Sequence, residues 1–147
     1  MANKSYKGVF KPINPKKYKG NPTNIIYRSL LELKVMIRFD NDPNIIEWSS
    51  EEHIVPYKCK TDNKLHRYFP DFVAKMRKPD GKIVTHMIEV KPASQTIPPV
   101  KGNKKKQTYL TEVMTYAKNH SKWEYAREYC KDRGWLFTII TEKEING

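Results

Sequence analysis

The stretch "RYFPDFVAKMRKPDGKIVTHMIEVKP", residues 67–92, decides the fold, because it reads as two strands joined by a tight turn. The turn is "KPDGK", in which Pro79 presets φ and Gly81 accepts a positive φ. Aromatic residues are frequent before the turn, and apolar residues alternate with polar ones after it. The sequence therefore predicts an antiparallel hairpin of strands 68–76 and 83–91.

Two charged residues interrupt the apolar end of the second strand. Side chains alternate along a strand, so Glu89 and Lys91 emerge on one face, two positions apart. Burying both charges is costly unless each of them is well paired. Pairing of the hairpin also brings Asp71 near Glu89 at one end of the sheet. Because clustered carboxylates repel one another, this arrangement predicts a bound cation there.

Carboxylate oxygens suit Mg²⁺, which is usually held by one or two carboxylates together with water and substrate phosphate. On a phosphodiester, such a metal activates water, neutralises the scissile phosphate and stabilises the leaving oxygen. A lysine beside the metal, here Lys91, orients the attacking water or neutralises charge that grows on phosphorus. Sequence alone does not choose between these two roles for Lys91.

A helix is expected upstream of the hairpin, over residues 24–39. The apolar stripe that predicts it consists of Ile26, Leu30, Leu33 and Ile37. Glu32, the first acidic residue of the chain, falls near Val35 and Phe39 on a helical wheel and therefore leans inward. An alternative for Glu32 is a helix-surface ion pair with Arg28, four residues earlier.

The remaining elements are short strands and two helices. The expected strands are 45–48, 53–57 and 135–141, and the expected helices are 104–118 and 122–132. The first of these helices turns Leu110, Val113, Met114 and Ala117 to the core, and Gly134 ends the second. This order predicts an α/β fold, a mixed sheet flanked by helices.

Charge indicates the class of partner. Twenty-eight Lys and Arg residues against 16 Asp and Glu residues give a net charge of +12. Such an excess attracts polyanions, which predicts DNA as the partner, although for any single lysine a solvated surface is the favoured interpretation. The residues expected to contact DNA are Arg28, Lys16, Lys17, Lys19, Lys101, Lys104, Lys105 and Lys106.

A length of 147 residues is enough for one compact domain. Residues 1–23 are basic and rich in proline, so we expect an extended arm that orders on a partner, followed by a single domain over 24–147. No apolar run reaches the roughly 20 residues of a membrane helix, which predicts a cytosolic protein without membrane contact. Cys59 and Cys130 are expected to be reduced thiols.

The pattern of Pro-Asp followed across a hairpin by Glu-x-Lys resembles the PD-(D/E)xK nuclease superfamily. The segments "YRSLLE", "RYFPDF", "IEVKP" and "KWEYAREYCKDRGWLFTIITE" are similar to those of the head completion nucleases of T4-like tailed bacteriophages. They also resemble the amino-terminal domain of the Tn7-type transposase endonuclease subunit. The resemblance covers roughly residues 8 to 144.

This resemblance implies a restriction-endonuclease-like αβββαβ core and metal-dependent cleavage of DNA, without establishing which DNA structure is cut; the expected partner is double-stranded or branched DNA. It implies a catalytic set of Glu32, Asp71, Glu89 and Lys91, of which Asp71 and Glu89 hold Mg²⁺, with Glu32 as a further candidate ligand and Mn²⁺ as a substitute metal. It further implies a role in completing the DNA-filled head before tail attachment, in the host cytoplasm or at the head-neck region, with head and neck proteins as candidate partners.

One alternative of a different class stays open. A nuclease fold does not by itself prove activity, so the chain could be a catalytically inactive head-completion or DNA-end-binding protein on a retained scaffold. The intact set of Glu32, Asp71, Glu89 and Lys91 favours the enzyme.

Overall fold

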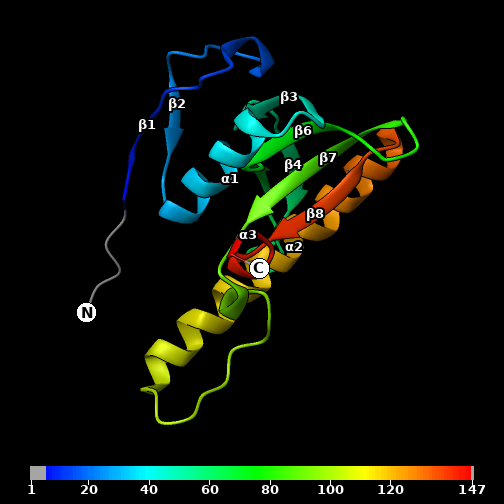
Figure 1. The fold of residues 1–147 in the computed structure, drawn as a ribbon. Coiled ribbons are helices and arrows are strands. Elements are labelled where there is room, and N and C mark those ends of the chain that lie inside the picture. The colour runs from blue at the N-terminus through cyan, green and yellow to red at the C-terminus, as the bar shows by residue number, and fades with distance from the viewer. Residues whose placement is uncertain (1–5, 147) are drawn as a thin grey trace.

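The computed structural model describes residues 6–146 (Figure 1). The strands are β1 (Gly8–Phe10), β2 (Ile25–Tyr27), β3 (Ile45–Ser50), β4 (Val55–Lys58), β5 (Leu65–Tyr68), β6 (Phe72–Arg77), β7 (Ile83–Val90) and β8 (Leu136–Ile140). The helices are α1 (Leu30–Asn41), α2 (Lys106–Arg133) and α3 (Glu142–Asn146), with 3₁₀ turns η1 (Pro15–Lys17) and η2 (Ala93–Gln95).

Four strands form the central sheet in the order β3-β6-β7-β8. β6 pairs antiparallel with both β3 and β7, whereas β7 and β8 are parallel and joined by the α2 crossover. Strands β4 and β5 form a separate two-stranded sheet between β3 and β6 in the chain. The order α1-β3-β6-β7-α2-β8 confirms the predicted α/β fold with a restriction-endonuclease-like core, and the β6–β7 pairing confirms the predicted hairpin.

The two faces of the sheet carry separate hydrophobic cores, because alternate residues of each strand point to opposite sides. On the α1 side, the strands contribute Ile45, Trp48, Phe72, Ala74, Ile88 and Val90. On the α2 side, the buried residues are Val55, Tyr57, Cys59, Tyr68, Val73, Met87, Trp123, Ala126 and Cys130. By the same alternation, Glu89 belongs to the side that α2 covers. This places the charged end of β7 against α2 rather than α1.

The basic N-terminal segment differs from the expected arm. Residues 6–23 pack against the domain, where β1 pairs with β2 and both Phe10 and Tyr18 are buried in the α1-side core. The reason is Asp40, which is 1% exposed and accepts hydrogen bonds from the backbone N–H groups of Ile13 (2.7 Å) and Asn14 (3.0 Å). The expectation of a segment ordered only by a partner is therefore wrong for residues 6–23, and residues 1–5 lie outside the described residues.

Helix α1 begins later than expected, at Leu30, because Ile25–Tyr27 form β2 instead. The Ser29 side chain caps the helix by accepting the backbone N–H of Glu32 at 3.1 Å. The inward face is not the predicted stripe, since Leu30 and Ile37 are 47% and 45% exposed. The buried residues of α1 are Val35, Met36, Phe39 and Asp40.

Helix α2 is one continuous helix of 28 residues where two helices were expected. Its C-terminal half packs on the sheet, and its N-terminal half extends beyond the sheet together with the loop after β7 (Figure 1). Leu110 and Met114, expected in the core, are therefore 43% and 52% exposed. Gly134 ends the helix at φ +70°, as expected. Among residues 6–146, no helix is both long and apolar enough to cross a membrane.

Candidate active site

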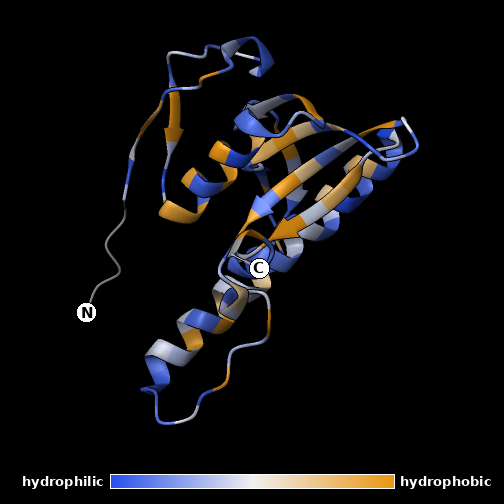
Figure 2. Cartoon of the chain, in the orientation of Figure 1, coloured by the Kyte–Doolittle hydropathy of each residue, from blue (hydrophilic) through white to orange (hydrophobic). Residues whose placement is uncertain are grey.

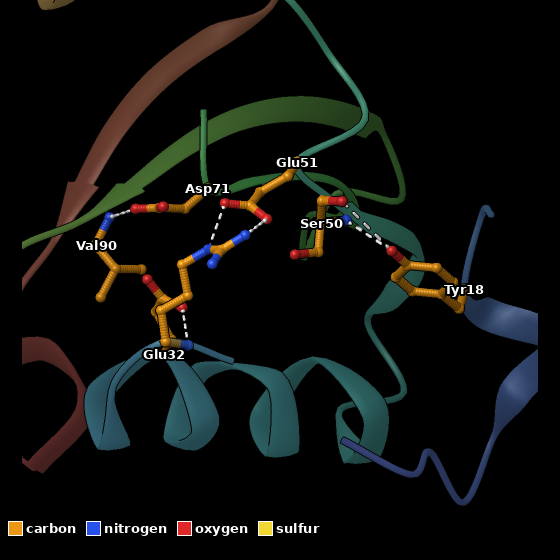
Figure 3. A network of polar contacts seen from close by, with 7 residues as sticks. Tyr18, Glu32, Ser50, Glu51, Asp71 and Val90 are labelled. Atoms are coloured by element: carbon orange, nitrogen blue, oxygen red, sulfur yellow. Dashed lines mark hydrogen bonds and ion pairs between the residues drawn. The ribbon is translucent and has the colours of Figure 1, made fainter. Parts of the chain in front are cut away.

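The predicted strand 68–76 is interrupted at "FPD", and this interruption positions Asp71. Residues 69–71 lie between β5 and β6, and the carbonyl of Asp71 accepts the backbone N–H of Glu51 at 3.1 Å. The register that pairs Phe72 with Ile88 continues to Asp71 opposite Glu89. The Asp71 carboxylate accepts the N–H of Val90 at 2.7 Å (Figure 3). As predicted, the hairpin brings the two acids together.

Glu89 is 5% exposed, and its carboxylate accepts a hydrogen bond from the hydroxyl of Tyr68. Tyr68 is also buried, at the end of β5. Burial and the neighbouring Glu89 carboxylate raise the pKa of Tyr68, so the phenol stays protonated and acts as a donor. The Tyr68 hydroxyl thereby holds the buried Glu89 carboxylate in one orientation.

The electrostatics of Asp71 are those of a crowded acidic pair. Burial, followed by the charge of Glu89, raises the pKa of Asp71 well above its usual range. Two carboxylates in this arrangement cannot both ionise easily without a positive partner. The pair is therefore suited to a cation.

Glu32 approaches this pair from α1. Its carboxylate accepts the backbone N–H of Arg28 at 2.8 Å, and burial raises its pKa, with a further rise from the charge of Glu51. The Arg28 guanidinium donates two hydrogen bonds, of 3.1 and 3.2 Å, to the Glu51 carboxylate (Figure 3). The alternative of an Arg28–Glu32 pair is not one between two turns of a helix, because Arg28 precedes the helix cap, but the two residues are in contact and the charge of Arg28 lowers the pKa of Glu32.

Lys91 follows directly after β7 and is half-buried, with its backbone N–H donated to the carbonyl of Ile140 at 3.0 Å. This hydrogen bond continues the β7–β8 pairing by one residue, which keeps Lys91 on the face of Glu89. Ile88 and Val90 point to the opposite core, as the alternation predicts.

Sequence reasoning missed Tyr68, the donor to Glu89, and two further residues of this site. Lys122 on α2 lies with its Nζ 5.6 Å from the centroid of the Tyr68 ring. Burial lowers the pKa of Lys122, and the nearby Glu89 carboxylate opposes that shift. The other missed residue, Glu51, has a φ of +55°, which is uncommon for a residue with a side chain. The signal for Lys122 was the alternation that turns Glu89 toward α2; the sequence carries no comparable signal for Glu51.

The basic residues expected to bind DNA do not form one surface. Lys16, Lys17 and Lys19 lie at η1, and Lys101, Lys104, Lys105 and Lys106 lie at the far end of α2 (Figure 1). Figure 2 shows hydrophilic residues at the tip of α2, whereas the loop beside the helix also has hydrophobic stretches.

Not all of these lysines are free to contact phosphate. The Nζ of Lys17 donates to the carbonyls of Asp40 (3.1 Å) and Asp42 (2.7 Å), so this lysine serves the fold. Lys104 pairs with Glu112 at 2.7 Å, whereas Lys105 and Lys106 are exposed.

Asp71 and Glu89 fit a divalent metal by the chemistry of their oxygens. Within residues 6–146, no three His, Cys, Asp or Glu side chains are grouped closely enough to hold a metal by themselves. Two carboxylates are nevertheless what Mg²⁺ commonly takes from a protein when substrate phosphate and water complete its shell. Glu32 stands near the pair without joining such a group.

Comparison with known proteins gives the family. The model of the TnsA-like endonuclease N-terminal family matches residues 42–142. The chain belongs to this family. The match of this endonuclease family includes Asp71, Glu89 and Lys91 and begins after Glu32.

The head completion nuclease of Enterobacteria phage T4 is a full-length relative. It is 37% identical over 142 residues, which are 94% of this chain and 92% of the relative. Both likenesses predicted from the sequence segments are confirmed.

Proposed function

We propose that this protein is a Mg²⁺-dependent DNA endonuclease. The observation that carries the proposal is the pairing of Asp71 and Glu89 at one end of the hairpin. Asp71 is half-buried and Glu89 is buried, and each carboxylate accepts a hydrogen bond from one donor that orients it. Membership of an endonuclease family supports the same conclusion. DNA as the substrate is supported by the net charge of +12.

Asp71 and Glu89 would hold the metal, and Glu32 is a further candidate ligand. Bound there, Mg²⁺ would supply an activated water and neutralise the scissile phosphate; Mn²⁺ is an expected substitute. The N–H of Val90 and the hydroxyl of Tyr68 orient the two carboxylates. Lys91, on the face of Glu89, neutralises charge that develops on phosphorus.

We further propose that the endonuclease acts in bacteriophage head completion, after DNA packaging and before tail attachment. The relative from phage T4, which is named a head completion nuclease and whose sequence aligns with nearly all of the chain, supports the head-completion part of this assignment. Its place of action would be the cytoplasm of the infected host, with head and neck proteins as partners.

The test is incubation of supercoiled plasmid with the protein and Mg²⁺. We expect nicking or linearisation of the plasmid. EDTA should abolish this cleavage, and Mn²⁺ added in excess of the EDTA should restore it. Asp71→Asn and Lys91→Ala should each lower the rate by about two orders of magnitude while DNA binding persists. Asp132→Asn, at an exposed position of α2, is the matched control and should cleave at the wild-type rate.

Cleavage by Asp71→Asn at the wild-type rate would contradict the site. Binding without cleavage, across plasmid, linear and branched DNA and with either metal, would favour the inactive scaffold.

A further inference from the structure

A cavity of about 540 Å³ lies between the N-terminal half of α2 and the loop that follows β7. Its volume falls in the range of small-molecule sites, roughly 300–1,000 Å³. Ile97, Pro98 and Pro99 form part of the loop wall, and Tyr116 and Asn119 belong to the helix wall. The cavity therefore combines flat apolar surfaces, one aromatic ring and an amide.

Asn119 is the unusual member of this wall. The residue is 7% exposed and lines the cavity, and its amide atoms are not among the fully buried polar atoms that lack a partner within residues 6–146. A side-chain amide offers two N–H donors and a carbonyl acceptor, so an amide at a cavity wall can bind both kinds of polar group. The position of Asn119 in the wall therefore suits a ligand with both donor and acceptor groups.

Both walls of the cavity begin beside the candidate active site. On the loop, Ser94 lines the cavity and follows Lys91 by three residues. On α2, Asn119 precedes Lys122 by three residues, so the two lie on one helix face. Lys122 stands over Tyr68, the donor to Glu89. A ligand that fills the cavity would therefore be attached to, or adjacent to, the phosphate at the site.

We propose that this cavity binds an unpaired nucleobase of the DNA, next to the scissile phosphate; the proposal rests on the function proposed above. Proline and tyrosine surfaces accept the flat faces of a base, and the Asn119 amide matches its donor and acceptor edge. The substrate class is then DNA with an unpaired nucleotide at the cleavage site, as in branched DNA, because a paired base must first be extruded at a cost.

The experiment measures binding in EDTA, so that it is independent of cleavage. Fluorescence anisotropy compares a duplex containing one extra unpaired adenosine with the same duplex containing an abasic nucleotide at that position. The abasic DNA keeps the backbone and its flexibility and lacks only the base. We expect the wild type to bind the adenosine DNA about tenfold more tightly than the abasic DNA.

Two variants address the cavity itself. Asn119→Leu removes the amide, and Thr115→Trp fills the cavity from an exposed position of its wall. Both should bring the tenfold ratio close to one. Met114→Trp places the same large ring on the neighbouring, 52% exposed residue outside the cavity wall and should keep the ratio. Circular dichroism checks folding, and Thr115→Trp decides alone if Asn119→Leu does not fold.

Equal affinity of the wild type for the two DNAs would overturn the proposal, as would an unchanged ratio in Thr115→Trp. Loss of the ratio in Met114→Trp as well would also overturn it, because the effect would then belong to the helix rather than the cavity. Plasmid cleavage by the wild type is measured separately, and its failure would overturn the enzymatic function instead.

Discussion

One hydrogen-bond donor orients each acid of the Asp71–Glu89 pair. One donor lies on the hairpin and the other at the end of β5, which precedes the hairpin. The Val90 N–H holds Asp71, and the Tyr68 hydroxyl holds Glu89. Such outer contacts typically tune metal affinity by about 10- to 100-fold when they are removed. Tyr68 is therefore a positioning residue, acting through Glu89.

Tyr68→Phe should raise the Mg²⁺ concentration needed for half-maximal cleavage about tenfold, because Glu89 loses the hydroxyl that orients it. The measurement is the initial rate of plasmid nicking across a Mg²⁺ titration. At saturating Mg²⁺ the variant should recover most of its rate, since the hydroxyl does not act on the phosphate.

Tyr57→Phe is the matched control, because Tyr57 is equally buried on β4 and packs against His66. Its Mg²⁺ requirement should equal that of the wild type. A Tyr68→Phe variant with an unchanged Mg²⁺ requirement would show that Glu89 is oriented by other contacts.

At this scale, the approach of Asp71 to Glu89 could be predicted, because it follows from strand register and alternation alone. The contacts of Tyr68 and Lys122 could not. They depend on where the separate β4–β5 sheet and α2 cross the sheet face, which no local pattern encodes. The positive φ of Glu51 accompanies the hydrogen bond from its backbone N–H to the Asp71 carbonyl, a contact that the residue type does not predict.

Among the elements, the N-terminal segment is held by a buried carboxylate together with a buried tyrosine and the pairing of β1 with β2. Asp40 near the end of α1 binds two backbone N–H groups of the segment, and the buried Tyr18 hydroxyl accepts the N–H of Ser50 at 3.1 Å. Proline and lysine content predicted an unattached arm because composition does not reveal a distant partner. The later start of α1 also follows from a contact with the N-terminal segment, because Ile25–Tyr27 pair with β1 instead of joining the helix.

Asp40→Asn should lower the free energy of unfolding by about 2 kcal/mol, because a charged acceptor of two hydrogen bonds becomes neutral and gains an N–H₂ that faces donors. Urea denaturation followed by circular dichroism measures this change as a lower midpoint at constant slope.

Asp132→Asn makes the same chemical change at an exposed position and should stay within about 0.5 kcal/mol of the wild type. If the two variants were equally stable, Asp40 would not be what holds the segment.

Helix α2 shows the limit of predicting an element from apolar periodicity. The break expected between residues 118 and 122 does not occur, because no glycine or proline lies between Lys106 and Arg133. The apolar residues Leu110 and Met114 predicted a core contact that the protruding half of the helix does not make. Its end at Gly134 was predictable, since the left-handed conformation there favours glycine.

For the molecule as a whole, the lysines expected to bind DNA are divided between the η1 segment and the tip of α2, and the acidic pair lies elsewhere. The tip lysines are exposed and lie on the half of α2 that extends beyond the sheet. The net charge was sufficient to predict DNA as a partner, but it could not show which lysines are engaged by the fold, as Lys17 is.

Replacing Lys105 and Lys106 by Ala should weaken DNA binding and make its salt dependence less steep. Loss of two phosphate contacts changes the slope of log affinity against log salt by about 2. Filter binding or anisotropy at several salt concentrations gives this slope.

The control replaces Lys78 and Lys82 by Ala, at the hairpin turn that lies away from Asp71 and Glu89. This variant removes the same amount of charge and should keep the wild-type slope. An unchanged slope in the Lys105 and Lys106 variant would exclude the tip from the DNA contact.

Because α2 is uninterrupted, the distance along it from the tip lysines to the candidate active site can be calculated. From Lys106 to Lys122 the helix advances 16 residues, which at 1.5 Å per residue is about 24 Å. B-DNA rises about 3.4 Å per base pair, so the same span corresponds to roughly seven base pairs. A duplex that lies along the helix reaches the tip lysines only if it continues about two-thirds of a turn past the cut. DNA ends shorter than this would meet the acidic pair without the basic tip.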